Sequence, residues 1–91
     1  MISDTDKNTI MNLSKQFGVG EVLLFGSGVD PDIPANDIDL GVRGIAPESF
    51  FDFYGALTLS LSKPVDLIDL SEKSRFAELI NREGVSVYVH N

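Results

Sequence analysis

Three aspartates and a Gly-Ser turn are the residues of this sequence whose types and spacing fit a chemical role. Asp37 and Asp39 stand one residue apart, at the end of a loop that follows Gly26 and Ser27. Alternate residues of a β-strand point to the same face, so a strand beginning at Ile38 would hold both carboxylates together. Two like charges held that close repel one another unless a cation lies between them. The pair therefore predicts a site for a hard metal ion.

Asp66 supplies a third carboxylate from another strand of the same predicted sheet. A Gly-Ser turn lets backbone approach a ligand closely, and its amides and small hydroxyl can hold phosphate oxygens. Mg²⁺ takes oxygen ligands, shares them with substrate phosphates, and as a pair of ions clamps both oxygens in phosphoryl transfer. Each feature alone also fits a plain turn or a solvated surface charge. Together they predict Mg²⁺-dependent phosphoryl-transfer chemistry, with two ions, carried by Gly26, Ser27, Asp37, Asp39 and Asp66.

The elements that must position these residues are helices and strands in the order α, β, β, α, β, α, β. Helix signals include a Ser3 and Asp6 pair that resembles a capping box, and prolines at 47 and 64 that open and end the second helix. The expected helices cover 4–17, 47–62 and a stretch capped by Ser71 and ending at Gly84, and the expected strands cover 21–25, 38–43, 65–70 and 85–90. This order predicts an α/β (α+β) fold, with a small mixed β-sheet of about four strands and helices packed against it.

Length and charge limit what the chain can be. Its 91 residues predict one domain spanning 1–91, and 14 acidic against 7 scattered basic residues give a net charge of −7. A nucleic-acid surface needs clustered Lys and Arg, so duplex nucleic acid is not an expected partner. No apolar run approaches the roughly 18 residues that would span a bilayer, and no signal peptide is visible. These observations predict a cytoplasmic protein that has no membrane partner.

Two other phosphate or metal motifs fail on spacing. A calcium loop starting at Asp30 and Asp32 needs glycine at its sixth position and glutamate at its twelfth, where Ala35 and Gly41 stand. A P-loop needs a Gly-Lys pair, which the sequence lacks. The Gly-Ser turn with its three aspartates is then the motif that remains.

The ordered segments Leu24-Phe25-Gly26-Ser27, Asp37-Ile38-Asp39-Leu40 and Val65-Asp66-Leu67-Ile68 resemble the signature of the nucleotidyltransferase superfamily related to DNA polymerase β. The short length is similar to its minimal nucleotidyltransferase branch, and the resemblance covers nearly the whole chain. It implies that Gly26 and Ser27 hold nucleotide phosphates. It also implies that Asp37 and Asp39 bind Mg²⁺ and that Asp66 helps to activate the attacking hydroxyl.

The resemblance further implies a biological setting. Minimal members are commonly encoded beside an all-helical HEPN-type protein and act as the antitoxin of a toxin–antitoxin pair, in some cases by transferring AMP to the toxin. The expected function is thus transfer of a nucleoside monophosphate from ATP or another NTP to a hydroxyl on a HEPN-type partner. Self-association through the helix-two or helix-three face is a second arrangement that the apolar stripes allow.

One departure from the family pattern keeps a second function open. Family members usually follow Gly-Ser with small and basic residues, whereas here the loop 28–37 carries Asp30 and Asp32 beside the expected triphosphate. This negative charge favours a catalytically inactive protein that keeps the fold and acts only by binding a partner. The three retained aspartates favour the enzyme.

Overall fold

The computed structural model describes residues 2–29, 32 and 36–90, which form seven regular elements and one short 3₁₀ helix. Of the expected loop at 28–37, residues 30–31 and 33–35 lie outside the described residues, and 28–29 belong to the short 3₁₀ helix. The helices and strands in chain order are α1 (Asp4–Phe17), β1 (Glu21–Phe25), η1 (Gly26–Val29), β2 (Ile38–Arg43), α2 (Pro47–Ser60), β3 (Val65–Asp69), α3 (Arg75–Glu83) and β4 (Val85–Val89). This order and these types confirm the α+β fold expected from the sequence.

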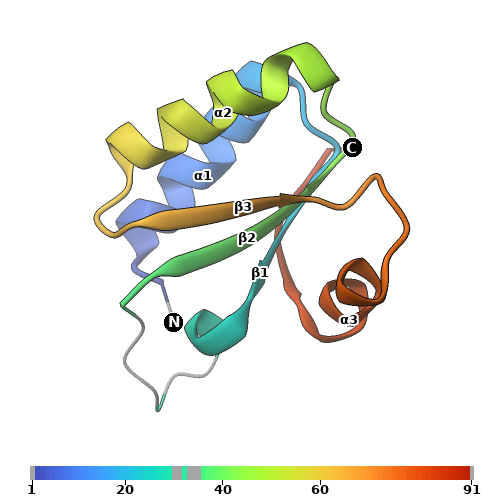
Figure 1. The fold of residues 1–91 in the computed structure, drawn as a ribbon. Helices are drawn as coiled ribbons and strands as arrows, with labels where there is room; N and C mark the ends of the chain where they lie inside the picture. The colour runs from blue at the N-terminus through green and yellow to red at the C-terminus, as the bar shows by residue number, and fades with distance from the viewer. Residues whose placement is uncertain (1, 30–31, 33–35, 91) are drawn as a thin grey trace.

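The four strands form one mixed sheet in the order β3-β2-β1-β4 (Figure 1). β1 runs antiparallel to both β2 and β4, while β2 and β3 are parallel. A parallel pair needs a crossover connection, and α2 supplies it between β2 and β3. Because β2 and β3 are parallel, their first residues lie next to each other at one end of the sheet.

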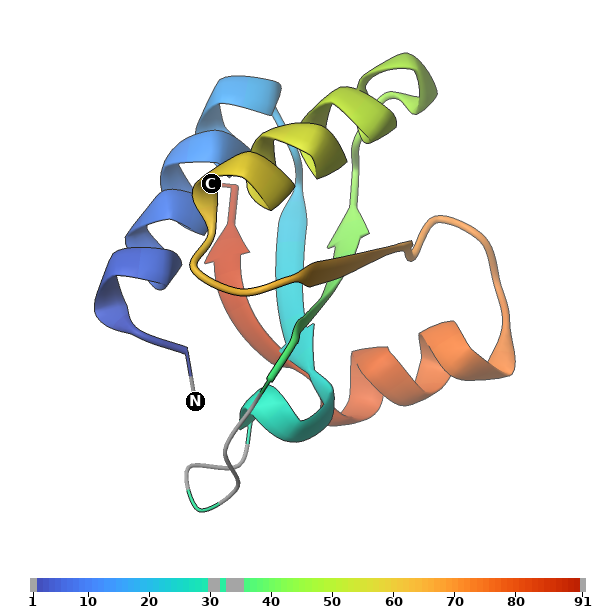
Figure 2. The same cartoon turned by 60° about the vertical axis from the view of Figure 1, so that its left-hand side comes forward.

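The helices cover the two faces of the sheet unequally. α1 and α2 lie side by side on one face, and α3 lies alone on the other (Figures 1 and 2). The large core lies under α1 and α2 and is built from fully buried side chains such as Ile10, Leu24, Leu40, Phe53 and Leu57. A smaller cluster of Leu23, Leu70, Ala77 and Ile80 lies under α3. Part of the α3 face is therefore left uncovered.

α3 packs directly onto the sheet because the strand beneath it carries a glycine. A Cβ on Gly41 would come within 2.8 Å of the Leu70 Cδ1 atom and 3.2 Å of the Ile80 Cγ2 atom. Arg43 also contacts both the Glu21 carboxylate and the Asn81 side-chain oxygen, so β1, β2 and α3 are joined at the end of β2. These contacts fix α3 over one half of the sheet.

Two local details differ from the sequence-based expectations. Ser74, and not Ser71, caps α3, because its side chain accepts a hydrogen bond from the Ala77 amide at 3.0 Å. The Ser71 amide instead donates to the Asp69 Oδ1 atom at 2.9 Å, which closes a turn after β3. α2 ends two residues earlier than expected, and β3 and β4 each end one residue earlier.

The capping box predicted at the start of α1 is half formed. The Asp6 amide donates to the Ser3 hydroxyl at 3.1 Å, as expected. The buried Asp6 carboxylate does not reach back to Ser3 but accepts hydrogen bonds from the Ser62 amide and hydroxyl. Asp6 thus joins α1 to the segment that follows α2.

No helix within the described residues is long and apolar enough to cross a membrane.

Candidate active site

Asp39 and Asp66 lie side by side on neighbouring strands. β2 and β3 are parallel, and in their register Asp39 is the direct partner of Asp66. Their neighbours Ile38, Leu40 and Leu67 are buried in the large core, so the two carboxylates stand on the opposite face, which α3 only partly covers. Two of the three predicted carboxylates are therefore brought together by strand pairing alone.

The glycine of the Gly-Ser turn lies directly against Asp39. Phe25, the last residue of β1, pairs with Asp39, and Gly26 follows with a φ of +73°. A Cβ built on Gly26 would lie 2.5 Å from the Asp39 Oδ2 atom, closer than side-chain carbons approach. The positive φ favours glycine, and any side chain here would displace the Asp39 carboxylate. The predicted phosphate turn and the predicted metal carboxylate are thus in contact.

Ser27 and Asp37 are placed less fully. Ser27 follows Gly26 in η1, and its side chain lies outside what the structure describes. Asp37 precedes β2 and is exposed. Asp30, the first acid of the loop, lies outside the described residues, and Asp32 is exposed.

The electrostatics of Asp39 show that the three carboxylates act on one another. Burial raises the pKa of the Asp39 carboxyl above its usual value, and the negative charges of Asp66 and then of Asp37 raise that pKa further. Ionised Asp39 is therefore disfavoured by its own neighbours. A cation at this place would relieve the repulsion, and it would find only oxygen donors, which is the donor set that Mg²⁺ prefers.

The carboxylates do not form a closed cage. Among the described residues, no group of three or more acidic or histidine side chains converges closely enough to hold a metal ion. Asp39 and Asp66 instead line an open hollow of about 430 Å³, which we call the acidic hollow. Its other lining residues are Phe25, Tyr54, Leu67, Ile68 and Phe76. The site is open to a substrate that brings oxygen ligands of its own, as a polyphosphate does.

Sequence reasoning did not assign Phe25 and Phe76 to the site. Their rings meet edge to face with centroids 5.6 Å apart at 86°, between β1 and the first turn of α3. Phe76 leaves 49% of its surface exposed, although it packs against Phe25. Phe25 closes an apolar strand, and its position just before the Gly-Ser turn was the signal that could have placed it here.

The strand order and the placement of the helices define a nucleotidyltransferase-like fold class. No family model matches this chain, and neither does any curated protein. Solved structures, in contrast, match it over almost its whole length. This match confirms the nucleotidyltransferase fold that the sequence motifs implied.

Several of the similar structures are described as toxin–antitoxin complexes. A chain of a toxin–antitoxin crystallised with AMP-PNP is 23% identical, with a TM-score of 0.74 over 92% of this chain and 73% of that one. A chain of the MntA–HepT toxin–antitoxin is 20% identical, with a TM-score of 0.72 over 97% and 74%. A chain from the complex of tri-AMPylated Shewanella oneidensis HEPN toxin with MNT antitoxin is 22% identical, with a TM-score of 0.71 over 93% and 71%. At these identities the shared feature is the fold.

Proposed function

We propose that this chain is a Mg²⁺-dependent nucleotidyltransferase that moves a nucleoside monophosphate from an NTP to a hydroxyl group and releases pyrophosphate. The observation that carries the proposal is the pairing of Asp39 with Asp66 beside Gly26. Gly26 lies so close to Asp39 that an added Cβ would meet the Asp39 carboxylate. Carboxylates whose charges oppose one another serve phosphoryl transfer better than they serve stability.

Each residue has a separate task in this proposal. Gly26 and Ser27 hold oxygens of the triphosphate against the end of β1. Asp37 and Asp39 would hold Mg²⁺, and Asp66 would help them to hold a second ion. When bound, Mg²⁺ neutralises the charge that develops on the phosphate oxygens.

Asp66 acts on the attacking group. It lies beside Asp39 on the open face of the sheet, so a hydroxyl brought to the α-phosphorus would meet its carboxylate. The hydroxyl oxygen forms a bond to the α-phosphorus, and the bond from that phosphorus to the β-phosphate oxygen breaks. The hydroxyl proton passes to Asp66, and pyrophosphate leaves with the electron pair of the broken bond.

The proposed acceptor is a hydroxyl side chain of a helical HEPN-type protein, and the proposed nucleotide is ATP. Support comes from the structures of similar fold, which include an AMP-PNP complex and a HEPN toxin that carries AMP in complex with an MNT antitoxin. On this chain, Phe51 and Leu59 leave 78% and 89% of their surface exposed on α2. Apolar side chains this exposed suit a partner surface, away from the site.

The test uses this chain together with a HEPN-type protein encoded beside it. After incubation with ATP and Mg²⁺, intact-mass spectrometry should show AMP added to the partner. Asp39→Asn should slow this addition by about 10²-fold or more, because it removes charge stabilisation in the transition state. Glu72→Gln, which changes an exposed acid in the segment after β3, is the control and should keep the wild-type rate.

One outcome would favour the second candidate function, an inactive partner-binding protein. In that case the partner would be bound and neutralised equally well by wild type and Asp39→Asn, and no AMP would appear on it in either sample. Calorimetry with millimolar ATP and Mg²⁺ would then also show no binding.

A further inference from the structure

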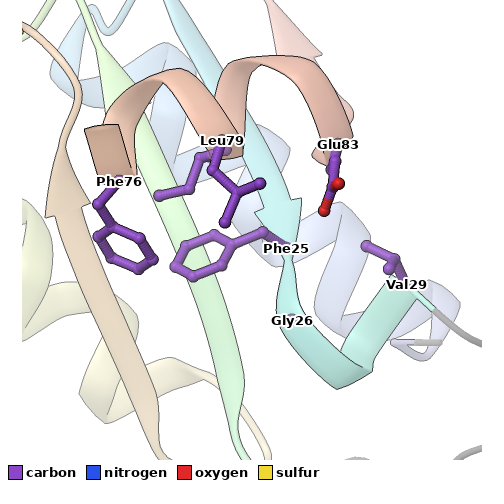
Figure 3. Close-up of a pocket in the computed structure, with 7 residues that line it drawn as sticks. Phe25, Gly26, Val29, Phe76, Leu79 and Glu83 are labelled. Atoms are coloured by element: carbon purple, nitrogen blue, oxygen red, sulfur yellow. The ribbon is translucent and has the colours of Figure 1, made fainter. Parts of the chain in front are cut away.

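A second hollow lies beside the acidic hollow, between η1 and α3 (Figure 3). We call it the apolar hollow; it measures about 330 Å³, and its lining includes Phe25, Val29, Phe76, Leu79 and Glu83. This volume falls in the range of roughly 300–1,000 Å³ that is usual for small-molecule sites. Its walls are apolar apart from Glu83, which points from the last turn of α3 into the hollow.

Gly26 connects this hollow to the carboxylates. It lines the apolar hollow on one side, and on the other it lies against the Asp39 Oδ2 atom. Phe25 and Phe76 line both hollows, so their ring pair forms the wall between them. A molecule that binds with its phosphates at Gly26 would therefore place the group next to those phosphates in the apolar hollow.

The side chains that line the apolar hollow suit a flat heteroaromatic ring. Phe25 and Phe76 offer aromatic surfaces, and Leu79 leaves 39% of its surface exposed above them. Aromatic side chains stack on nucleobases whatever the base. A purely apolar ligand would leave the Glu83 carboxylate without a hydrogen-bond donor. A carboxylate only accepts hydrogen bonds, so it selects ring substituents that donate them.

We infer that the apolar hollow binds the nucleobase of the NTP, with the ring against Phe25 and Phe76 and with Glu83 accepting a hydrogen bond from an exocyclic amine. The inference rests on the proposed nucleotidyltransferase function and adds a base preference to it. Adenine and cytosine carry such an amine, whereas uracil and hypoxanthine present a carbonyl oxygen at the same place, which the Glu83 carboxylate repels. The predicted order is therefore ATP before ITP, although these two nucleotides have almost the same shape.

The first measurement compares three Mg²⁺ complexes by calorimetry on the wild-type chain: ATP, ITP and inorganic tripolyphosphate. ATP should bind about tenfold more tightly than ITP, and more tightly still than tripolyphosphate, because only ATP gains both stacking and the hydrogen bond. If ATP and tripolyphosphate bind equally well, the base site is refuted while the phosphate and metal site stands. If none of the three binds, the proposed function itself fails.

The second measurement uses variants of residues that line the apolar hollow. Phe76→Ala should weaken ATP binding by about tenfold and leave tripolyphosphate binding unchanged. Phe51→Ala, an exposed phenylalanine on α2, is the control and should change neither affinity. Glu83→Gln should bring the ATP and ITP affinities together, because an amide both donates and accepts. Equal loss of ATP and tripolyphosphate binding in Phe76→Ala would overturn the inference, since it would show that Phe76 only supports the fold.

Discussion

The two faces of the sheet are built for different purposes. The face under α1 and α2 is closed: Val22, Leu24, Leu40, Phe53 and Leu57 are all fully or almost fully buried. The face under α3 is half open, with a small cluster of four buried residues next to two hollows and a pair of carboxylates. Stability resides in the first face, while the second retains groups that a cation or a ligand would satisfy.

The open face holds residues that work against the fold. The raised pKa of Asp39 means that burial and its acidic neighbours make its ionised form costly, and a buried apolar residue there would remove that cost. Gly26 is held in a left-handed conformation against Asp39. Stability given up at a few clustered positions is typical of a binding or catalytic site.

The largest effect that tests this comparison belongs to the closed face. Leu57→Ala removes a fully buried side chain from the centre of the large core, and we expect it to lower the free energy of unfolding by about 2–5 kcal/mol. Leu59→Ala, on the same helix but 89% exposed, should change that free energy by no more than about 0.5 kcal/mol. Urea denaturation measures both. Similar costs for the two would mean that α2 is not packed as described.

The next effect belongs to the Gly-Ser turn on the open face. Gly26→Ala forces a Cβ against the Asp39 Oδ2 atom, and we expect it to abolish detectable binding of AMP-PNP with Mg²⁺. Gly18→Ala is the matched control, because Gly18 also has a positive φ of 68° but has nothing within 4 Å of an added Cβ. Both variants should lose about 1 kcal/mol of stability from backbone strain. Retained binding in Gly26→Ala would show that the turn does not hold the nucleotide.

Much of this fold could be predicted from the sequence because its local signals agree. The alternation of Ile38, Leu40 and Val42 predicts both ends of β2 correctly, and it places Asp39 on the opposite face of the strand. The predicted cap of α3 was wrong because Ser71 and Ser74 both suit the N-terminus of a helix. The Ser71 amide donates to Asp69 in a turn, and Ser74 caps the helix instead. At the edge strand β4, a register shift opposite Val22 and Leu23 buries Val87 and Tyr88 together, which simple alternation does not predict.

The candidate site was predictable in its residue types but not in its contacts. The strand order β3-β2-β1-β4 and the parallel pairing of β2 with β3 place Asp39 beside Asp66, and no local pattern specifies either. The Phe25 and Phe76 pair was missed for the same reason, because it joins residues far apart in the chain through the packing of α3. Non-local pairing of this kind depends on the whole fold.

The smallest effect concerns the repulsion within the open face. The pKa of Asp39 is raised in the folded state, so its ionisation destabilises the fold progressively as pH rises above about 4. Asp66→Asn removes the larger of the two charge contributions to this pKa, at nearly constant side-chain volume. In EDTA at pH 7 the variant should therefore be more stable than wild type by up to about 1 kcal/mol, after discounting for solvent screening.

The melting temperature measures this gain, which corresponds to at most roughly 4–8 °C in a domain of this size. The gain should shrink as pH falls towards 4, because Asp39 becomes protonated in wild type and the repulsion disappears. Asp52→Asn, which removes an exposed charge from α2, should show no comparable pH-dependent gain. Mg²⁺ with ATP should raise the melting temperature of wild type more than that of Asp66→Asn. A destabilised Asp66→Asn with an unchanged ligand response would instead make Asp66 a structural residue, and the two faces would then differ in packing alone.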